Sequence, residues 1–233
     1  MEPLYQIKVV CSCCESSFET SRVRPSLKKA VKRDSDFCSY FKEVNPDYYV
    51  VRVCPYCGFA STENFAERLS DKQKKAYLDK IGNQWQIRDY GGNRDEADAM
   101  ECYKLSLLSA QTVGENERVI AGLLHHIAWL YRYKGNAEQE NRFLAFALGA
   151  YISVFENERD SLNNARLLFL IGELHRRLGQ YNDAVRWFSR VIHDKNITDS
   201  AMIRASREQW QSIREELTGR GMELPEEMKQ DGA

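Results

Sequence analysis

The sequence has no excess of charge of either sign and no long apolar run. Its 233 residues include 33 lysines and arginines and 34 aspartates and glutamates, so the formal net charge is -1 at pH 7. Domains that bind nucleic acid over much of their surface are usually strongly basic, so this balance argues against such a footprint. No apolar run approaches the length of a membrane span, and no charged-then-apolar leader opens the chain. We therefore expect a cytoplasmic protein without membrane contacts.

The chain also lacks the short motifs of common enzyme classes. It contains no Gly-x-Ser-x-Gly, no Walker phosphate loop and no Gly-x-Gly-x-x-Gly. The histidines are His125, His126, His175 and His193, and they do not form a His-Glu-x-x-His zinc motif. We therefore expect no enzymatic activity.

Two Cys-x-x-Cys pairs stand out among the seven cysteines. Cys11-Ser12-Cys13-Cys14 and Cys54-Pro55-Tyr56-Cys57 each follow a β-branched run that ends in valine. Two residues between cysteines let one tight turn aim both sulfurs at one ion, and tetrahedral zinc takes four thiolates. The spacing predicts one structural zinc ion held by Cys11, Cys14, Cys54 and Cys57, in a small β module resembling a zinc ribbon. Four thiolates leave no open position for a reactive water.

Other interpretations of these cysteines remain open. Four thiolates also hold iron-sulfur clusters, and a thioredoxin-like redox motif uses Cys-x-x-Cys, although between a strand and a helix. Cys13 lies inside the first pair and Cys38 lies between the pairs, so either thiol is an alternative ligand or a buried small side chain.

The region between the cysteine pairs carries the only basic run of the chain. Its members are Arg22, Arg24, Lys28, Lys29, Lys32 and Arg33. Such a run would supply phosphate contacts, so a nucleic-acid-binding protein using the ribbon and residues 22–33 is the alternative function. The aromatic residues expected of a stacking platform are missing, which favours a solvated loop. Asn45-Pro46-Asp47 then predicts a turn into a strand over residues 48–53.

The rest of the chain has a helical period and divides into three further parts. After the ribbon-like module of residues 1–69, we expect a connector helix within 70–94 that begins at the cap Ser70. A helical domain of residues 95–218 and a polar tail of residues 219–233 follow. The predicted fold is mainly α with a small β module.

The helical domain contains a segment that resembles a tetratricopeptide repeat. Residues 171–188 include small Gly172 and Ala184 where two antiparallel helices would approach, and Leu178-Gly179 as a left-handed helix cap. A weaker copy lies around residues 127–148, where Gly135 is the cap. The two cap glycines are farther apart than the repeat length of about 34 residues, so the repeats are atypical.

Stacked helical hairpins present the first helix of each repeat to a concave surface. By analogy with tetratricopeptide repeats, that surface would carry His125 and the predicted partner-binding residues Trp129, Arg132, Tyr133, Phe169, Glu173, Arg176 and Arg177. Aromatic and arginine side chains commonly anchor peptides, and arginines favour an acidic segment. We therefore expect a scaffold that binds a protein or peptide. The competing interpretation is that half of these residues pack against the connector helix or the ribbon.

The whole chain resembles a bacterial family of unassigned function that joins a cysteine-pair ribbon to a tetratricopeptide-like helical region. The resemblance rests on Arg33-Asp34-Ser35-Asp36-Phe37-Cys38, Asn45-Pro46-Asp47-Tyr48-Tyr49, Cys54-Pro55-Tyr56-Cys57-Gly58-Phe59-Ala60 and Ile127-Ala128-Trp129-Leu130-Tyr131-Arg132. It implies the same architecture and adds no activity.

Overall fold

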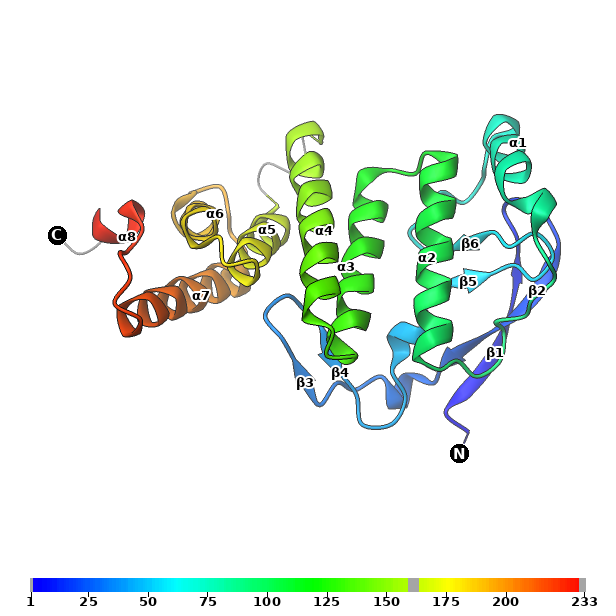
Figure 1. The fold of residues 1–233 in the computed structure, drawn as a ribbon, viewed down its shortest axis with the longest axis horizontal. Helices are drawn as coiled ribbons and strands as arrows, with labels where there is room; N and C mark the ends of the chain where they lie inside the picture. Colours follow the sequence, from blue (N-terminus) through cyan, green and yellow to red (C-terminus); the bar gives the residue numbers. More distant parts are fainter. Residues whose placement is uncertain (1, 159–163, 231–233) are drawn as a thin grey trace. The chain divides into compact units, whose positions relative to one another are not determined.

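A computed structural model describes residues 2–158 and 164–230. The chain forms two compact units (Figure 1). Unit 1 contains Met1–Asp34 and Cys38–Phe143, and unit 2 contains Ser35–Phe37 and Leu144–Ala233. The domain boundaries predicted at residues 69, 94 and 218 stay predictions. The chain as a whole is mainly helical with a small β region, as the sequence predicts, and its strands form antiparallel pairs.

Three short strand pairs belong to unit 1. Strands β1 (Leu4–Val10) and β2 (Ser17–Val23) pair over their full length, from Leu4 opposite Val23 to Val10 opposite Ser17. Strands β5 (Arg52–Val53) and β6 (Ala60–Ser61) form a second pair, and β3 (Lys32–Arg33) and β4 (Ser39–Tyr40) form a third. The first two pairs each enclose one of the predicted cysteine turns.

The strand predicted over residues 48–53 is wrong for residues 48–51, since only Arg52–Val53 is a strand. Pro46–Tyr49 forms a 3-10 helix, because the Asn45 side chain accepts a hydrogen bond from the Asp47 amide and Pro46 starts the turn. The guanidinium of Arg94 then donates to the carbonyls of Tyr48 and Val51, at 2.9 and 2.7 Å. Arg94 thereby satisfies these backbone acceptors in place of a neighbouring strand.

The helices of unit 1 are capped by the residues that precede them. The predicted cap Ser70 starts α1 (Asp71–Lys80) and forms a capping box with Gln73. Asp95 does the same for α2 (Glu96–Val113), and Asn116 caps α3 (Glu117–Tyr133). Helix α4 (Ala137–Asn157) begins in unit 1 and continues in unit 2.

One core joins the cysteine turns of unit 1 to its helices. Phe59, next to the second turn, meets the ring of Tyr77 from α1 edge to face, with ring centroids 4.9 Å apart. The buried side chains of Tyr103 and Ile127 bring α2 and α3 into the same core. The backbone amide of Ala60 donates to Ser109 Oγ on α2 at 3.2 Å. The cysteine region therefore does not have a core separate from helices α1 to α3.

Unit 2 consists mainly of α5 (Ala165–Arg177), α6 (Tyr181–His193), α7 (Ser200–Gly219) and the short α8 (Glu226–Gln230). Gly179 ends α5 with φ of 74°, as predicted for a left-handed cap. A Cβ on Gly172 would lie 2.9 Å from the Phe188 ring, so glycine permits the close approach of α5 and α6. Met228 of α8 is fully buried in this unit, so this part of the predicted polar tail packs against the helices. Residues 231–233 lie outside the described part.

Candidate metal centre

Unit 1 brings the four predicted cysteines together. The Sγ atoms of Cys11, Cys14, Cys54 and Cys57 all lie within 4.8 Å of one another. The sulfurs of Cys11 and Cys57 are 3.7 Å apart, and those of Cys14 and Cys54 are 3.6 Å apart. Four sulfurs bound tetrahedrally at about 2.3 Å from one ion would be about 3.8 Å apart. The donor set and its spacing therefore fit a single metal ion.

The two turns that carry the cysteines share a backbone hydrogen bond and a left-handed residue at the same place. The amide of Glu15 donates to the carbonyl of Cys11, and the amide of Gly58 donates to the carbonyl of Cys54, both at 2.9 Å. The residue after the last cysteine is left-handed in both turns, with φ of 64° at Glu15 and 73° at Gly58. Glutamate rarely adopts this conformation. Its side chain pairs with Lys74 of α1 at 2.6 Å, which ties the first turn to the helices.

The sulfurs are largely shielded from solvent and compete for protons. Cys54 is fully buried, and Cys11 and Cys57 are each 4% exposed. Hydrogen bonds between the sulfurs raise the pKa of Cys11 to about 12 and lower the pKa of Cys54. The same interactions raise the pKa of Cys57 well above its usual range. If all four sulfurs were thiolates, four negative charges would meet in a largely buried site, and a bound metal ion would balance them.

The remaining cysteines occupy different environments. Cys13 is buried beside the cluster, and its backbone amide donates to Cys11 Sγ at 3.4 Å. Cys38 lies outside the cluster, where its thiol contacts Tyr133 Oη at 3.4 Å. Cys102 is fully buried in α2, and burial raises its pKa to about 11.

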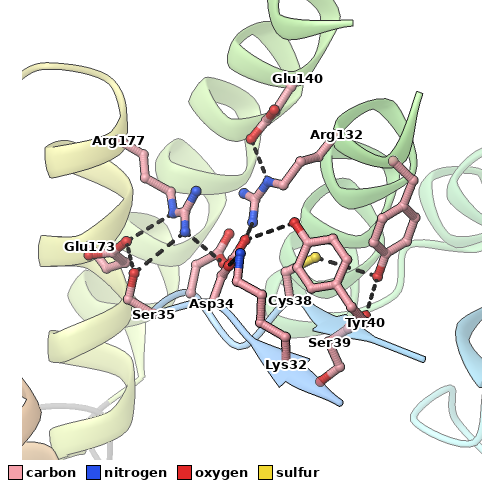
Figure 2. A network of polar contacts seen from close by, with 12 residues as sticks. Lys32, Asp34, Ser35, Cys38, Ser39, Tyr40, Arg132, Glu140, Glu173 and Arg177 are labelled. Atoms are coloured by element: carbon pink, nitrogen blue, oxygen red, sulfur yellow. Dashed lines mark hydrogen bonds and ion pairs between the residues drawn. The ribbon is translucent and has the colours of Figure 1, made fainter. Parts of the chain in front are cut away.

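The predicted partner-binding residues of unit 1 contact other parts of the same chain. Trp129 packs beside His125 and His126, with ring centroids 4.6 and 4.4 Å away. Arg132 binds Asp34 at 3.0 Å and Glu140 at 2.7 Å (Figure 2). Tyr133 donates its hydroxyl to the backbone oxygen of Ser39 at 2.8 Å. Asp34 and Ser39 belong to the predicted ribbon module of residues 1–69, so Arg132 and Tyr133 pack in part against that module, as the competing interpretation expects.

The predicted residues of unit 2 lie on α5 and hold the segment Ser35–Phe37. Glu173 is fully buried and binds Arg176 at 2.8 Å and Arg177 at 2.9 Å. Its carboxylate also accepts a hydrogen bond from Ser35 at 2.6 Å (Figure 2). The ring of Phe169 lies against Phe37, with centroids 5.8 Å apart. Binding of an external partner by these residues stays a prediction.

The sequence patterns predict no role for Ser35–Phe37. Two aspartates, Asp34 and Asp36, directly precede Phe37 in the segment that carries part of the family resemblance. The predicted helical surface carries arginines and aromatic residues. An acidic stretch beside an aromatic residue is complementary to such a surface, and this is the signal in the sequence that points to the segment.

Most of the basic run is engaged within the chain. Arg22 pairs with Glu63, and Lys32 pairs with Asp34 at 3.0 Å. Arg24 donates to the backbone oxygen of Glu2 at 2.8 Å, and Arg33 donates to Ser39 at 3.1 Å. The remaining two, Lys28 and Lys29, are exposed. Within the described residues, no helix has the length and apolar character needed to cross a membrane.

Comparison with known families identifies the chain. Residues 4–213 match the model of an uncharacterized protein family conserved in bacteria, DUF2225, and the chain belongs to this family. No curated protein and no solved structure shows significant similarity to it.

Proposed function

We propose that this member of the DUF2225 family is a non-catalytic scaffold, stabilised by one structural zinc ion, that binds a protein or peptide through its helices. The observation that carries the proposal is the cluster of Cys11, Cys14, Cys54 and Cys57, in which Cys14 is half-buried and the other three are buried. Four sulfur ligands complete a tetrahedral site and leave no position for a substrate or a reactive water. The metal would then contribute to folding, and recognition would belong to the helices.

The spacing of the sulfurs supports zinc over the other metal centres. Separations of 3.6 and 3.7 Å suit one ion at the centre of the four sulfurs. An iron-sulfur cluster with several irons would hold its cysteines farther apart. Thiols that must remain reduced to bind zinc fit a reducing compartment, so we also propose a cytoplasmic location.

The helix pairs support a tetratricopeptide-like arrangement. Gly135 and Gly179 end α3 and α5 in the same left-handed conformation, with φ of 67° and 74°. The following amides of Asn136 and Gln180 donate to the carbonyls of Tyr131 and His175, at 3.0 and 2.9 Å. Both turns are therefore Schellman caps, and each joins a helix to the next. We take the two helix-turn-helix segments to be two repeats.

Metal content of the full chain tests the zinc part of the proposal. Purified without added metal, the protein should contain close to one zinc ion per chain. Cys57→Ser should lose most of it, because a serine hydroxyl is a poor replacement for a thiolate. Cys13→Ser is the matched control and should keep it. Absence of zinc from the wild type, or iron in its place, would contradict this part.

Affinity capture from the native bacterium tests the scaffold part. The full-length chain should retain a reproducible protein partner, and the zinc-loaded state should be required if unit 1 takes part. Arg176→Ala changes a predicted contact residue and should retain less of the partner. Arg186→Ala changes an arginine of α6 outside the predicted set and is the control, which should retain the partner as the wild type does. If neither the wild type nor the two variants retain a protein, the scaffold proposal fails.

The nucleic-acid alternative has weaker support. Four of the six basic residues in 22–33 bind acidic groups or polar oxygens of the chain, which leaves Lys28 and Lys29 as its main candidates. A pair of lysines supplies a small phosphate contact compared with the six to ten that strong binders commonly make.

A further inference from the structure

Unit 2 contains a short piece of the N-terminal region, Ser35–Phe37, bound against α5. Each of its three residues has its own contact. Ser35 donates to Glu173, and Asp36 pairs with Arg177 at 3.3 Å. Phe37 lies beside Phe169, and the guanidinium of Arg166 stands 4.3 Å from the centre of the Phe37 ring. The segment is thus held as a peptide ligand would be, by a polar, an acidic and an aromatic contact in succession.

The charged groups of this site are buried. The side chains of Asp36 and Glu173 are fully buried, and that of Arg177 is 18% exposed. Buried charges persist in proteins when partners compensate the loss of water. Glu173 has Arg176 and Arg177 as partners, and Arg177 additionally binds Asp36. One of the two arginines is therefore held by an α5 carboxylate in a position to accept a second, incoming carboxylate.

The backbone of the segment is strained at the aromatic residue. Phe37 has φ of 71°, in a region that residues with a large side chain rarely occupy. Next to the segment, the amide of Asp34 donates to the carbonyl of Cys38 at 2.8 Å, which closes a tight turn. Strain of this kind is kept when surrounding contacts enforce it, and it often marks a binding element. A separate peptide with the same side chains would not have to adopt this turn.

We propose that the α5 surface of unit 2 recognises an acidic-aromatic sequence, Ser-Asp-Phe or a close equivalent, in a partner protein. Ser35–Phe37 is the internal occupant of that surface and competes with the partner. Arg177 binds the acidic side chain, and Phe169 with Arg166 binds the aromatic ring. This inference rests on the proposed scaffold function and specifies the class of its partner.

A peptide-binding measurement tests the inference. The probe is a fluorescent peptide with the sequence of residues 32–40 in which Cys38 is replaced by serine, and the protein is the zinc-loaded full chain. The variant Asp36→Ala/Phe37→Ala removes the internal side chains. It should bind the probe at least about tenfold more tightly than the wild type, because occupancy of a site by a competitor reduces apparent affinity in proportion.

Two controls define the site. A probe that carries Asn and Ala in place of Asp36 and Phe37 should not bind, and adding Arg177→Ala to the double variant should remove the gain. Equal affinity of the wild type and the folded double variant, or a gain that persists with Arg177→Ala, would overturn the inference. If circular dichroism shows that the double variant is unfolded, Asp36→Asn decides the question. It should bind about threefold more tightly than the wild type, and unchanged affinity would overturn the inference.

The result can be separated from the scaffold proposal itself. Zinc content and retention of a cellular partner are measured on the same preparations. If the peptide does not bind but the partner is retained, this inference fails and the scaffold proposal stands. If no partner is retained, the scaffold proposal fails.

Discussion

Gly58 lies directly against the indole ring of Trp85. A Cβ on Gly58 would be 2.3 Å from Cε3 of that ring, and Trp85 itself is fixed by a hydrogen bond from its Nε1 to the carbonyl of Pro55, at 2.9 Å. The backbone at Gly58 is also left-handed. The second cysteine turn is therefore closed by a residue that needs to be glycine for two independent reasons.

Replacement of Gly58 by alanine should accordingly destabilise unit 1. We expect the free energy of unfolding to fall by about 2–4 kcal/mol, from the strained conformation and from displacement of Trp85. Denaturant unfolding followed by tryptophan fluorescence and circular dichroism measures the loss. Gly92→Ala is the matched control, because a Cβ there meets no atom within 4 Å and its φ is not left-handed. Equal stability of both variants would contradict the prediction.

We expect Arg132 to contribute more to the free energy of unfolding than an exposed arginine that also pairs with two acidic residues. Its side chain is 11% exposed and binds Asp34 and Glu140, which are 13% and 15% exposed. Removal of Arg132 takes a cationic partner from two largely buried carboxylates, although Asp34 keeps its pair with Lys32, so Arg132→Ala should cost about 3 kcal/mol.

The control for Arg132 is Arg88, whose side chain is 51% exposed and pairs with Glu101. Arg88→Ala should cost less than about 1 kcal/mol, because water screens the pair. A double-mutant cycle between Arg132→Ala and Asp34→Ala isolates the pairwise energy. A coupling near zero would show that the ion pair does not stabilise unit 1.

We expect the free energy of unfolding to fall as the pH rises through the mildly acidic range, because the buried carboxyl of Asp47 loses its proton there. Burial raises the pKa of this carboxyl, and the opposing influences of His126 and of the Tyr133 hydroxyl do not offset it. The folded state therefore holds the proton at a pH where the unfolded chain, with a pKa of about 3.9, has lost it. Since the folded state then binds more protons, stability is highest below the unfolded pKa and falls as the pH rises through the folded pKa.

The variant Asp47→Asn tests this dependence because its amide does not titrate. The difference in unfolding free energy between wild type and Asp47→Asn, measured from pH 3.5 to 7, should shift in favour of the variant as the pH rises. Asp183→Asn, at a side chain that is 51% exposed on α6, provides the comparison. A difference that is constant over this range would contradict the assignment.

These residues also show what the sequence reveals and what it does not. The clustering of Cys11, Cys14, Cys54 and Cys57 could be predicted because a Cys-x-x-Cys turn fixes its own geometry locally, and the caps Ser70 and Gly179 could be predicted for the same reason. The contacts of Arg94 with Tyr48 and Val51 depend on residues more than 40 positions away. Periodicity does not report such contacts, so the local pattern alone predicts a strand over the whole of residues 48–53.

Helix α5 shows the same difference between what local spacing predicts and what depends on distant residues. Repeat-like spacing identified Phe169, Glu173 and Arg177 as residues of one helix with binding chemistry. Their contacts with Ser35–Phe37 join positions more than 130 residues apart, and no local pattern predicts that pairing. The complementary charges of Asp36 and Arg177 could be seen in the sequence, but not that they meet.

The scaffold proposal predicts no appreciable binding of nucleic acid. In about 150 mM salt, the full chain should bind neither a duplex DNA nor a single-stranded RNA of mixed sequence at micromolar protein. The double variant Lys28→Glu/Lys29→Glu should behave as the wild type does. If the wild type binds, and binding weakens both with salt and with this charge reversal, the nucleic-acid alternative takes precedence.

Loss of the metal should unfold more of unit 1 than its cysteine turns. Cys54 and Cys57 pack in the same buried cluster as Phe59, Tyr77 and Tyr103, so the metal site and helices α1 and α2 share one core. Four uncompensated thiols in that core favour opening, and binding of a structural metal contributes directly to folding free energy. Removal of the ion with a chelator should therefore lower amide-exchange protection in β1, β2, α1 and α2, while α5 and α6, which have their own buried cluster with Phe169 and Phe188, stay protected. Hydrogen exchange read by mass spectrometry measures both regions in one sample, with Cys57→Ser as the genetic counterpart and Cys13→Ser as its control. Loss of protection limited to the two cysteine turns would show that the ion stabilises only its local loops.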